Sequence, residues 1–447
     1  MFEGILQSFT IPEVRKRILF TLGVFAVYRL GAWIPVPGID PDQVTRFFND
    51  QTGAAAGIFG FINLFTGNAF RNFSLFALGV IPYINASIIM SLLQNVVPYL
   101  KELNKEGDEG RKILQKYIRY GTVGLAFFQA AGVAIFISSS VSASGPLLLP
   151  DTSPVLFYLT TIICLTSGTM FLMWLGERIT ENGIGRGVSM IIMAGIIASY
   201  PATFGQAFIY IQGDTSKAIW LLIIPIMFLV VVAGVVMIQL GARRVEIQYA
   251  KRIVRGKVYG GQNTYIPFAV NQGGVIPIIF AAAILTFFQI PIQLLSKGAM
   301  ANSDFLQLLN LDMSRGGVIY LVLYSLMIIF FTYFYSTIVF NPQDLADNLR
   351  RWGGYIPGIR PGKPTSDYLE RIQSRLLTIG GVFLVLIALL PYVVQGMSGL
   401  QAFYALGGTS VLIAVGVGVD TMKQIEAHMV ERHYESLIRK GGPALGR

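Results

Sequence analysis

Long apolar runs separated by short polar connections cover almost the whole chain. The runs are about 20 residues long, which is the length that an α-helix needs to cross the hydrocarbon core of a bilayer. They predict ten membrane-spanning helices, near residues 18–37, 73–98, 118–139, 154–174, 187–210, 218–240, 273–292, 316–340, 376–395 and 401–420. With 53% hydrophobic and only 13% charged residues, the composition agrees with an all-α polytopic membrane protein.

Two internal repeats link the halves of this pattern. Gly-Val-Ile-Pro occurs at 79–82 and again at 274–277, and the glycine, serine and isoleucine spacing of 187–195 returns at 408–416. These segments open spans two and seven, and five and ten, which cross in opposite directions. The sequence therefore predicts two inverted-topology halves of five spans around a shared cleft near the midplane.

The predicted organisation has four parts and a hinge at 205–217. They are a cytoplasmic N-terminal segment 1–17, a first half 18–210, a second half 211–420 and a cytoplasmic C-terminal tail 421–447. The first span is expected to be retained as an anchor rather than removed as a signal peptide.

Basic residues give the orientation. If the two ends and alternate loops share one side, that side holds 28 of the 34 Lys and Arg residues of a chain whose net charge is +10. The positive-inside rule makes this side cytoplasmic, and an even number of spans puts both termini there.

A long basic loop is predicted on this side at about 241–272. Val245, Ile247 and Tyr249 alternate with polar residues before a Gly-Gly pair, which is typical of a β-hairpin.

A second long loop, at about 341–375, begins with Asn341-Pro342, continues as a short helix and reaches a segment rich in proline and glycine. Because proline fixes φ and glycine permits reversals, this segment should hold Arg360 at a stiff, exposed tip. Both loops are interpreted as contacts for a large cytoplasmic partner. The alternative, loops that are merely solvated, explains their charge but not their length.

Residues 53–72 combine glycines with large apolar side chains and predict an apolar helix, at about 57–70, that is too short to span. Such a segment must fold back into the protein or, alternatively, lie at the outer membrane interface.

The sequence offers no catalytic or metal-binding pattern. His428 and His433 lie in the tail, and the one cysteine, Cys164, lies within an apolar run, where packing is its expected role. We therefore expect no enzyme activity, cofactor or metal. The middle of the spans also lacks acids and bases; Arg29 and Asp420 lie toward span ends. An ion-coupled solute transporter would be expected to keep such groups at the midplane.

Aliphatic residues occupy the equivalent mid-span positions instead. They are Ile84, Ile88, Val188, Ile192, Ile279 and Ile413. Converging on one axis, they would form a narrow, dewetted constriction that blocks ions without binding them. Taken singly, each of them could equally be a helix-packing or lipid-facing residue, and it is their recurrence at repeat-related positions that favours the constriction.

Several ordered motifs extend from end to end and resemble those of the SecY family, the central subunit of the bacterial protein-conducting channel. They are Ile34-Pro35-Val36-Pro37-Gly38, the stretch 79–87, Met173-Trp174-Leu175-Gly176-Glu177 with Gly183-Ile184-Gly185, Asn341-Pro342, the stretch 357–362 and Gly407-Gly408-Thr409-Ser410.

The resemblance implies an hourglass pore with those six aliphatic residues as its ring; Val188 is a mild departure, because isoleucine is common there. It implies a plug that includes Gly57, Phe59, Phe61, Ile62, Leu64 and Phe65, and a lateral gate between spans two and seven that includes Pro82, Ser87, Gln94, Pro277 and Ala281. Docking of the motor SecA or the ribosome, including its RNA, would use Lys251, Arg252, Arg255, Lys257 and Arg360.

The function expected from the resemblance is translocation of unfolded polypeptides across the bacterial inner membrane, with lateral release of signal sequences and membrane helices into lipid. SecE and SecG would be companion subunits, and signal peptides, nascent chains and membrane lipids would be the other contacts. The energy would come from SecA or from the ribosome. The alternatives are a small-solute secondary transporter with an inverted repeat, and a membrane scaffold or insertase without a pore.

Overall fold

The chain forms two compact units, which are described separately. The computed structural model describes residues 11–50, 60, 62–139, 141–142, 145–149, 153–212, 219–249, 252–254, 257–259, 264–285, 312, 317–398 and 408–441. The first unit comprises Met1–Gly213, Tyr404–Leu406 and Ile413–Arg447, and the second comprises Asp214–Phe403 and Gly407–Leu412.

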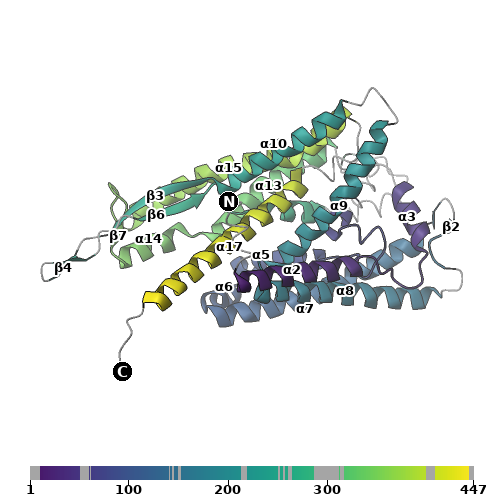
Figure 1. The fold of residues 1–447 in the computed structure, drawn as a ribbon, viewed down its shortest axis with the longest axis horizontal. Helices are drawn as coiled ribbons and strands as arrows, with labels where there is room; N and C mark the ends of the chain where they lie inside the picture. Colours follow the sequence, from purple (N-terminus) through teal and green to yellow (C-terminus); the bar gives the residue numbers. More distant parts are fainter. Residues whose placement is uncertain are drawn as a thin grey trace. The chain divides into compact units, whose positions relative to one another are not determined.

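The first unit is a helical bundle built around α8. Its elements are α2 (Pro12–Gly31), α3 (Pro41–Asp50), α5 (Ile81–Val96), α6 (Pro98–Lys105), α7 (Asp108–Ser139), a hairpin of β1 (Val141–Ser142) and β2 (Gly145–Pro146), α8 (Pro154–Asn182), α9 (Gly187–Gln212) and α17 (Gly408–Gly441) from Ile413 onward. Helices α2, α5, α7 and α9 all pack against α8, and α5 also packs against α7 (Figure 1).

The second unit combines three long helices with a small sheet. Its elements are α10 (Trp220–Leu240), β3 (Ala242–Tyr249), β4 (Arg252–Val254), β5 (Lys257–Tyr259), β6 (Thr264–Ala269), α13 (Val318–Val339), α14 (Pro342–Arg351), β7 (Gly354–Tyr355) and α15 (Lys363–Ser398). Residues 276–285 are also helical. Helices α10, α13 and α14 each pack against α15.

Proline opens many of these helices. Pro12, Pro98, Pro154 and Pro342 all lie in the first turn, where the missing N–H costs no hydrogen bond and the fixed φ already suits a helix. At α14 the side chain of Asn341 also accepts a hydrogen bond from the Gln343 N–H at 3.1 Å, so Asn341-Pro342 is a complete helix start. The predicted short helix after these two residues is confirmed.

Helices suited to a membrane dominate the described residues. Six are long and apolar enough to cross one, at Asp108–Ser138, Pro154–Asn182, Gly187–Gly205, Ile223–Leu240, Val318–Arg351 and Lys363–Gly396. Two shorter apolar helices, Ile81–Gln94 and Ile276–Leu285, begin spans two and seven of the prediction. The multi-span helical character is confirmed; the count of ten spans stays a prediction.

The predicted start of span two, at residue 73, is wrong. The helix begins at Ile81, and residues 67–80 form turns and one bridge residue. Gly67, Asn68, Phe73 and Gly79 all have positive φ in this segment, which is incompatible with a right-handed helix. An apolar run therefore folds as a compact turn structure, because hydrophobicity alone does not report backbone conformation.

The predicted hairpin at 241–272 is confirmed. β3 and β6 pair antiparallel from Ala242↔Ala269 to Ile247↔Thr264, and β4 pairs with β5 beyond them. Val245 and Ile247 are buried with exposed fractions of 5% and 1%, in keeping with the period-two alternation.

Candidate functional site

The six side chains predicted to form the pore ring lie on four elements. Ile84 and Ile88 are on α5, Val188 and Ile192 on α9, Ile413 on α17, and Ile279 in the helical segment 276–285 of the second unit. On α5 and α9 the two side chains are four residues apart and so share one helix face. Both helices pack against α8. Ile88, Ile192 and Ile413 are buried, and the other three are half-buried. Convergence of all six on one axis stays a prediction, because they belong to both units.

Helix α9 starts in direct contact with α8. A Cβ atom added to Gly187 would lie 1.7 Å from the Gly176 carbonyl oxygen, and one added to Gly176 would lie 3.0 Å from Cγ2 of Val188. Only glycine permits this approach. The position of Val188 is thus fixed by backbone contact at Gly176.

The turn at 183–187 links two further helices, α17 and α2, to the start of α9. The Gly185 N–H donates to Oε1 of Gln424 on α17 at 3.0 Å, and the Ile184 N–H donates to Oγ1 of Thr21 on α2 at 3.2 Å. Gly185 has φ of +87°, which favours glycine. Sequence reasoning gave this glycine-rich stretch no role, and the partners that use it are up to 239 residues away.

The predicted plug is described in part. Gly57, Phe59 and Phe61 lie outside the described residues. Residues 62–66 are helical and residues 67–70 form turns, so the predicted end of this helix at about residue 70 is wrong. Leu64 and Phe65 are buried, and Ile62 packs against an apolar cluster that includes Phe70 and Phe73. This end of the segment is therefore folded into the protein.

Residues of α2 and α9 hold the end of that helix. The Tyr28 hydroxyl donates to the Thr66 carbonyl oxygen at 2.8 Å, and Nη1 of Arg29 donates to the Gly67 carbonyl oxygen at 2.8 Å. A Cβ atom on Gly67 would lie 2.9 Å from Cα of Gly195. We call Tyr28, Arg29, Thr66, Gly67 and Gly195 the plug seat. The sequence placed Arg29 at the outer end of span one without a partner, and Gly195 was visible only as a member of the repeat.

The predicted gate residues are divided between the units. On α5, Pro82 is buried in the first turn, and Ser87 and Gln94 are half-buried. Pro277 and Ala281 are buried in the second unit. The gate between them stays a prediction.

The helical segment 276–285 is packed on α13. The ring of Phe280 meets Phe331 edge-on with centroids 5.6 Å apart, and meets Tyr335 at 6.3 Å. Such edge contacts are favoured by aromatic quadrupoles. This helix therefore moves with α13 or must break these contacts.

A buried polar network fixes the residues just before that helix. Nε2 of Gln373 donates to Oγ of Ser336 at 2.8 Å, and Ser336 Oγ donates to Oε1 of Gln272 at 2.8 Å. Ser336 and Gln373 are buried, so each lost bond would leave an unsatisfied polar atom. The network joins α13, α15 and the end of the hairpin loop, and sequence reasoning did not find it.

The two long basic loops form one body. β7 from the second loop pairs with β3 of the first through Gln248↔Tyr355 and Tyr249↔Gly354. A shared core fills the space beneath, made of Val245, Phe268, Ile356, Leu369, Ile372 and Leu376. We call β3, β6, β7, α14 and the start of α15 the platform; these elements lie together in Figure 1. The sequence predicted both loops but not their union.

Arg360 lies exposed at a turn of the platform. Gly358 and Gly362 on either side have φ of +79° and +104°, and the Arg360 carbonyl oxygen accepts a hydrogen bond from Thr365 Oγ1 at 2.9 Å. The predicted exposed proline–glycine tip is thus confirmed. Of the other predicted docking residues, Arg252 lies on β4 and Lys257 on β5, and Lys251 and Arg255 lie outside the described residues.

Metal-binding groups do not gather in the described part of the chain, where no cluster of three or more His, Cys, Asp or Glu side chains occurs.

The comparisons agree on one family. The sequence model of SecY matches residues 74–422. The protein translocase subunit SecY of Thermotoga maritima is 46% identical over 444 residues, covering 99% of each chain. Two solved structures have a similar fold, and each match covers 99% of both chains. A structure from work on the SecY plug domain, which stabilises the closed state of that channel and maintains its membrane seal, gives a TM-score of 0.65 at 19% identity. Sec61 from a canine ribosome–channel complex gives a TM-score of 0.58 at 18% identity.

These findings define the class of protein as a multi-pass membrane subunit with the fold of protein-conducting channels. The chain belongs to the SecY family of protein translocase subunits. Nothing in the comparisons supports the solute-transporter alternative.

Proposed function

We propose that this chain forms the channel through which a translocase of the bacterial inner membrane moves unfolded polypeptides, and that both its termini are cytoplasmic. The observation that carries the proposal is the adjacency, in the first unit, of aliphatic mid-span residues and a seated short helix. Ile192 lies three residues before Gly195, the plug-seat residue of α9 that contacts Gly67. Helix α9 thus carries part of the proposed constriction and also contacts the plug segment, which suits a channel that is sealed at rest.

The aliphatic ring accounts for selectivity without binding. Side chains such as Ile88 and Ile192 offer no hydrogen bonds, so a narrow ring of them excludes water and ions while accepting a polypeptide of any sequence. For a membrane-destined segment, lateral release through a gate between α5 and the 276–285 helix is driven by the apolar surface of that segment.

The platform is the proposed docking surface for the energy source. Its exposed arginines suit both the phosphates of ribosomal RNA and acidic protein surfaces. The relationship to a ribosome-bound channel supports a ribosome partner, and the SecA motor together with SecE and SecG completes the proposed assembly.

Deleting residues 57–67 tests the channel. In a planar bilayer, the reconstituted complex lacking this segment should conduct ions at rest more than the intact complex does, because the stopper is gone. A matched control deletes tail residues 442–447, which should leave the conductance at its original level. An unchanged resting current after the first deletion would contradict the plug.

Replacing Arg360 with Glu tests docking. We expect SecA-driven export to fall while the amount of the subunit in the membrane stays normal, because an exposed charge is reversed without loss of packing. Arg375→Glu, on α15, is the control for a charge change elsewhere in the chain. Normal export by the Arg360 variant would refute the docking role.

A further inference from the structure

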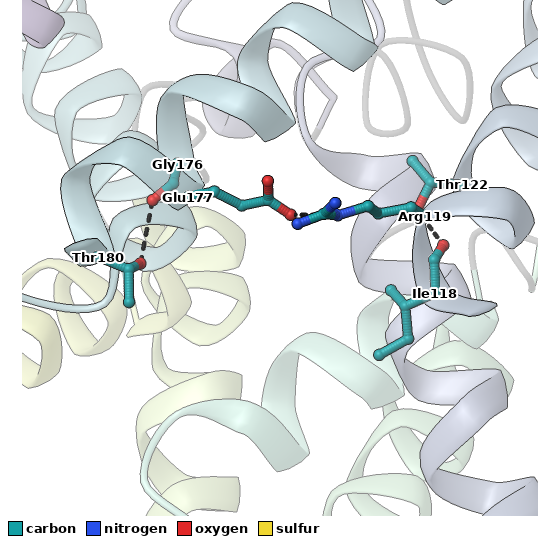
Figure 2. Close-up of polar contacts among 6 residues, drawn as sticks. All are labelled: Ile118, Arg119, Thr122, Gly176, Glu177 and Thr180. Atoms are coloured by element: carbon teal, nitrogen blue, oxygen red, sulfur yellow. Dashed lines mark hydrogen bonds and ion pairs between the residues drawn. The ribbon is translucent and has the colours of Figure 1, made fainter. Parts of the chain in front are cut away.

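An ion pair joins α7 to α8 at the point where each helix changes from apolar to charged sequence. Nε of Arg119 on α7 is 2.7 Å from Oε1 of Glu177 on α8, and Figure 2 shows the two side chains extended toward each other from their helices. In α7 the residues from Tyr120 to Ser139 carry no charge, and in α8 none precedes Glu177. The pair therefore ends two long uncharged helical segments.

The neighbouring hydroxyls do not compete for these charges. Thr122 Oγ1 donates to the Ile118 carbonyl oxygen at 2.7 Å and Thr180 Oγ1 to the Gly176 carbonyl oxygen at 3.0 Å (Figure 2). Each hydroxyl is satisfied within its own helix. Among the residues drawn in Figure 2, only Arg119 and Glu177 link α7 to α8.

The link lies next to two of the ring positions. Gly176, directly before Glu177, has the Cβ-free face that Val188 packs against. On α5, Ala86, two residues after Ile84, packs against α7 close to Arg119: a Cβ atom added to Gly121 would lie 3.5 Å from Cβ of Ala86. Helix α5 packs against both α7 and α8. The pair is therefore in a position to fix the first turn of α5.

Long charged side chains at the ends of apolar spans can reach the polar interface at little cost. The side chains of Arg119 and Glu177 are 47% and 31% exposed, so they are not a packed core element. A link of this kind contributes little to global stability but can fix the relative position of two helices.

We propose that the Arg119–Glu177 pair is a positioning clamp that holds the first turn of α5 and thereby sets Ile84 in the closed ring. The inference rests on the proposed channel function. Arg119 and Glu177 are positioning residues, and neither of them is required to touch the translocated chain.

The test uses the complete reconstituted complex and measures resting ion conductance in a planar bilayer. Glu177→Gln should raise the conductance about 1.4- to 5-fold, the range that corresponds to losing a partly exposed ion pair. The exchanged variant, Arg119→Glu with Glu177→Arg, should return it toward the original value.

The control lies on the same helix. Arg178 and Glu181 form an exposed pair at 3.1 Å within α8, and Glu181→Gln should leave the conductance unchanged, because that pair links no second helix. The amount of complex in the membrane and its thermal unfolding are measured for every variant, and both should stay near the original values.

An unchanged conductance for Glu177→Gln would overturn the clamp, as would a leak that the exchanged variant fails to reduce. A fall in thermal stability without a leak would show a packing role only and would also overturn it. The deletion of 57–67 in the same preparation separates the two proposals. If the deletion leaks and Glu177→Gln does not, the clamp alone fails; if the deletion itself does not leak, the channel proposal fails.

Discussion

Gly67 and Gly274 have the same φ, +61°, in very different surroundings. A Cβ atom on Gly67 would meet Cα of Gly195 at 2.9 Å and the Tyr28 hydroxyl at 3.1 Å, whereas one on Gly274 would meet nothing within 4 Å. Both positions need a residue that tolerates the left-handed region, but only Gly67 also lacks room for a Cβ atom. The plug seat therefore depends on a glycine for two independent reasons.

Replacing each glycine with alanine separates the backbone requirement from the steric one. Gly274→Ala should lower the free energy of unfolding by about 1–2 kcal/mol, the cost of a left-handed alanine. Gly67→Ala should lower the free energy of unfolding by about 1–3 kcal/mol more than that, because the added Cβ atom also overlaps its closely packed neighbours. Thermal unfolding of the purified complex compares the two. Equal losses would show that the approach of Gly67 to Gly195 carries no steric constraint.

Removing one hydroxyl tests the seat without steric change. Tyr28→Phe deletes the 2.8 Å hydrogen bond to the Thr66 carbonyl oxygen, which keeps its bond from the Ala69 N–H at 3.2 Å, so the cost should be about 0.5–1.5 kcal/mol. The resting conductance of the reconstituted channel should rise, because the seat holds the plug less firmly. Tyr392→Phe, whose hydroxyl bonds to Tyr320 at 3.3 Å in the second unit, is the control; a rise of the same size there would argue against a specific seat.

Among the elements, β3 could be predicted from the sequence pattern and β7 could not. The alternation of Val245 and Ile247 predicts a strand and its buried face, because side chains in a strand alternate between faces. β7 is only two residues long, too short to carry any pattern. Its pairing with β3 exists because the core around Ile356 and Leu369 brings the second loop against the first.

Leu369→Ala should loosen the platform. Leu369 is 0% exposed in the shared core, so its truncation should cost about 2–5 kcal/mol of local stability. Amide hydrogen exchange should then speed up in β3 and β7 together, since they rest on the same core. Trp352→Ala is the control, because Trp352 is 70% exposed and its loss should change exchange very little. Faster exchange in β7 alone would contradict a single folded body.

The chain as a whole has a strong charge asymmetry, which predicts its orientation independently of any local detail. Because Lys and Arg gather on alternate loops, the positive-inside rule predicts that the platform lies in the cytoplasm and the start of α8 outside. Both regions expose a residue that can be replaced by cysteine for labelling, Trp352 and Ser153. Orientation can therefore be read by thiol labelling.

In a Cys164→Ser background, a membrane-impermeant thiol reagent added to intact cells should label Ser153→Cys and should not label Trp352→Cys. Labelling of both after the membrane is permeabilised controls for reactivity. Labelling of Trp352→Cys from outside would reverse the orientation and remove the proposed docking surface from the cytoplasm.

The sequence by itself determined the membrane class, the two related halves, the hairpin, the helix after Asn341-Pro342 and the tip at Arg360. Each of these depends on a local property: the length of an apolar run, a period of two, the fixed φ of proline or the freedom of glycine. Only the tertiary structure decided that residues 67–80 form turns, that Tyr28 and Gly195 hold the plug segment, that the two basic loops share a core, and that Arg119 meets Glu177. These contacts join residues tens to hundreds of positions apart, and their energy comes from close approach and hydrogen-bond geometry, which no local pattern encodes.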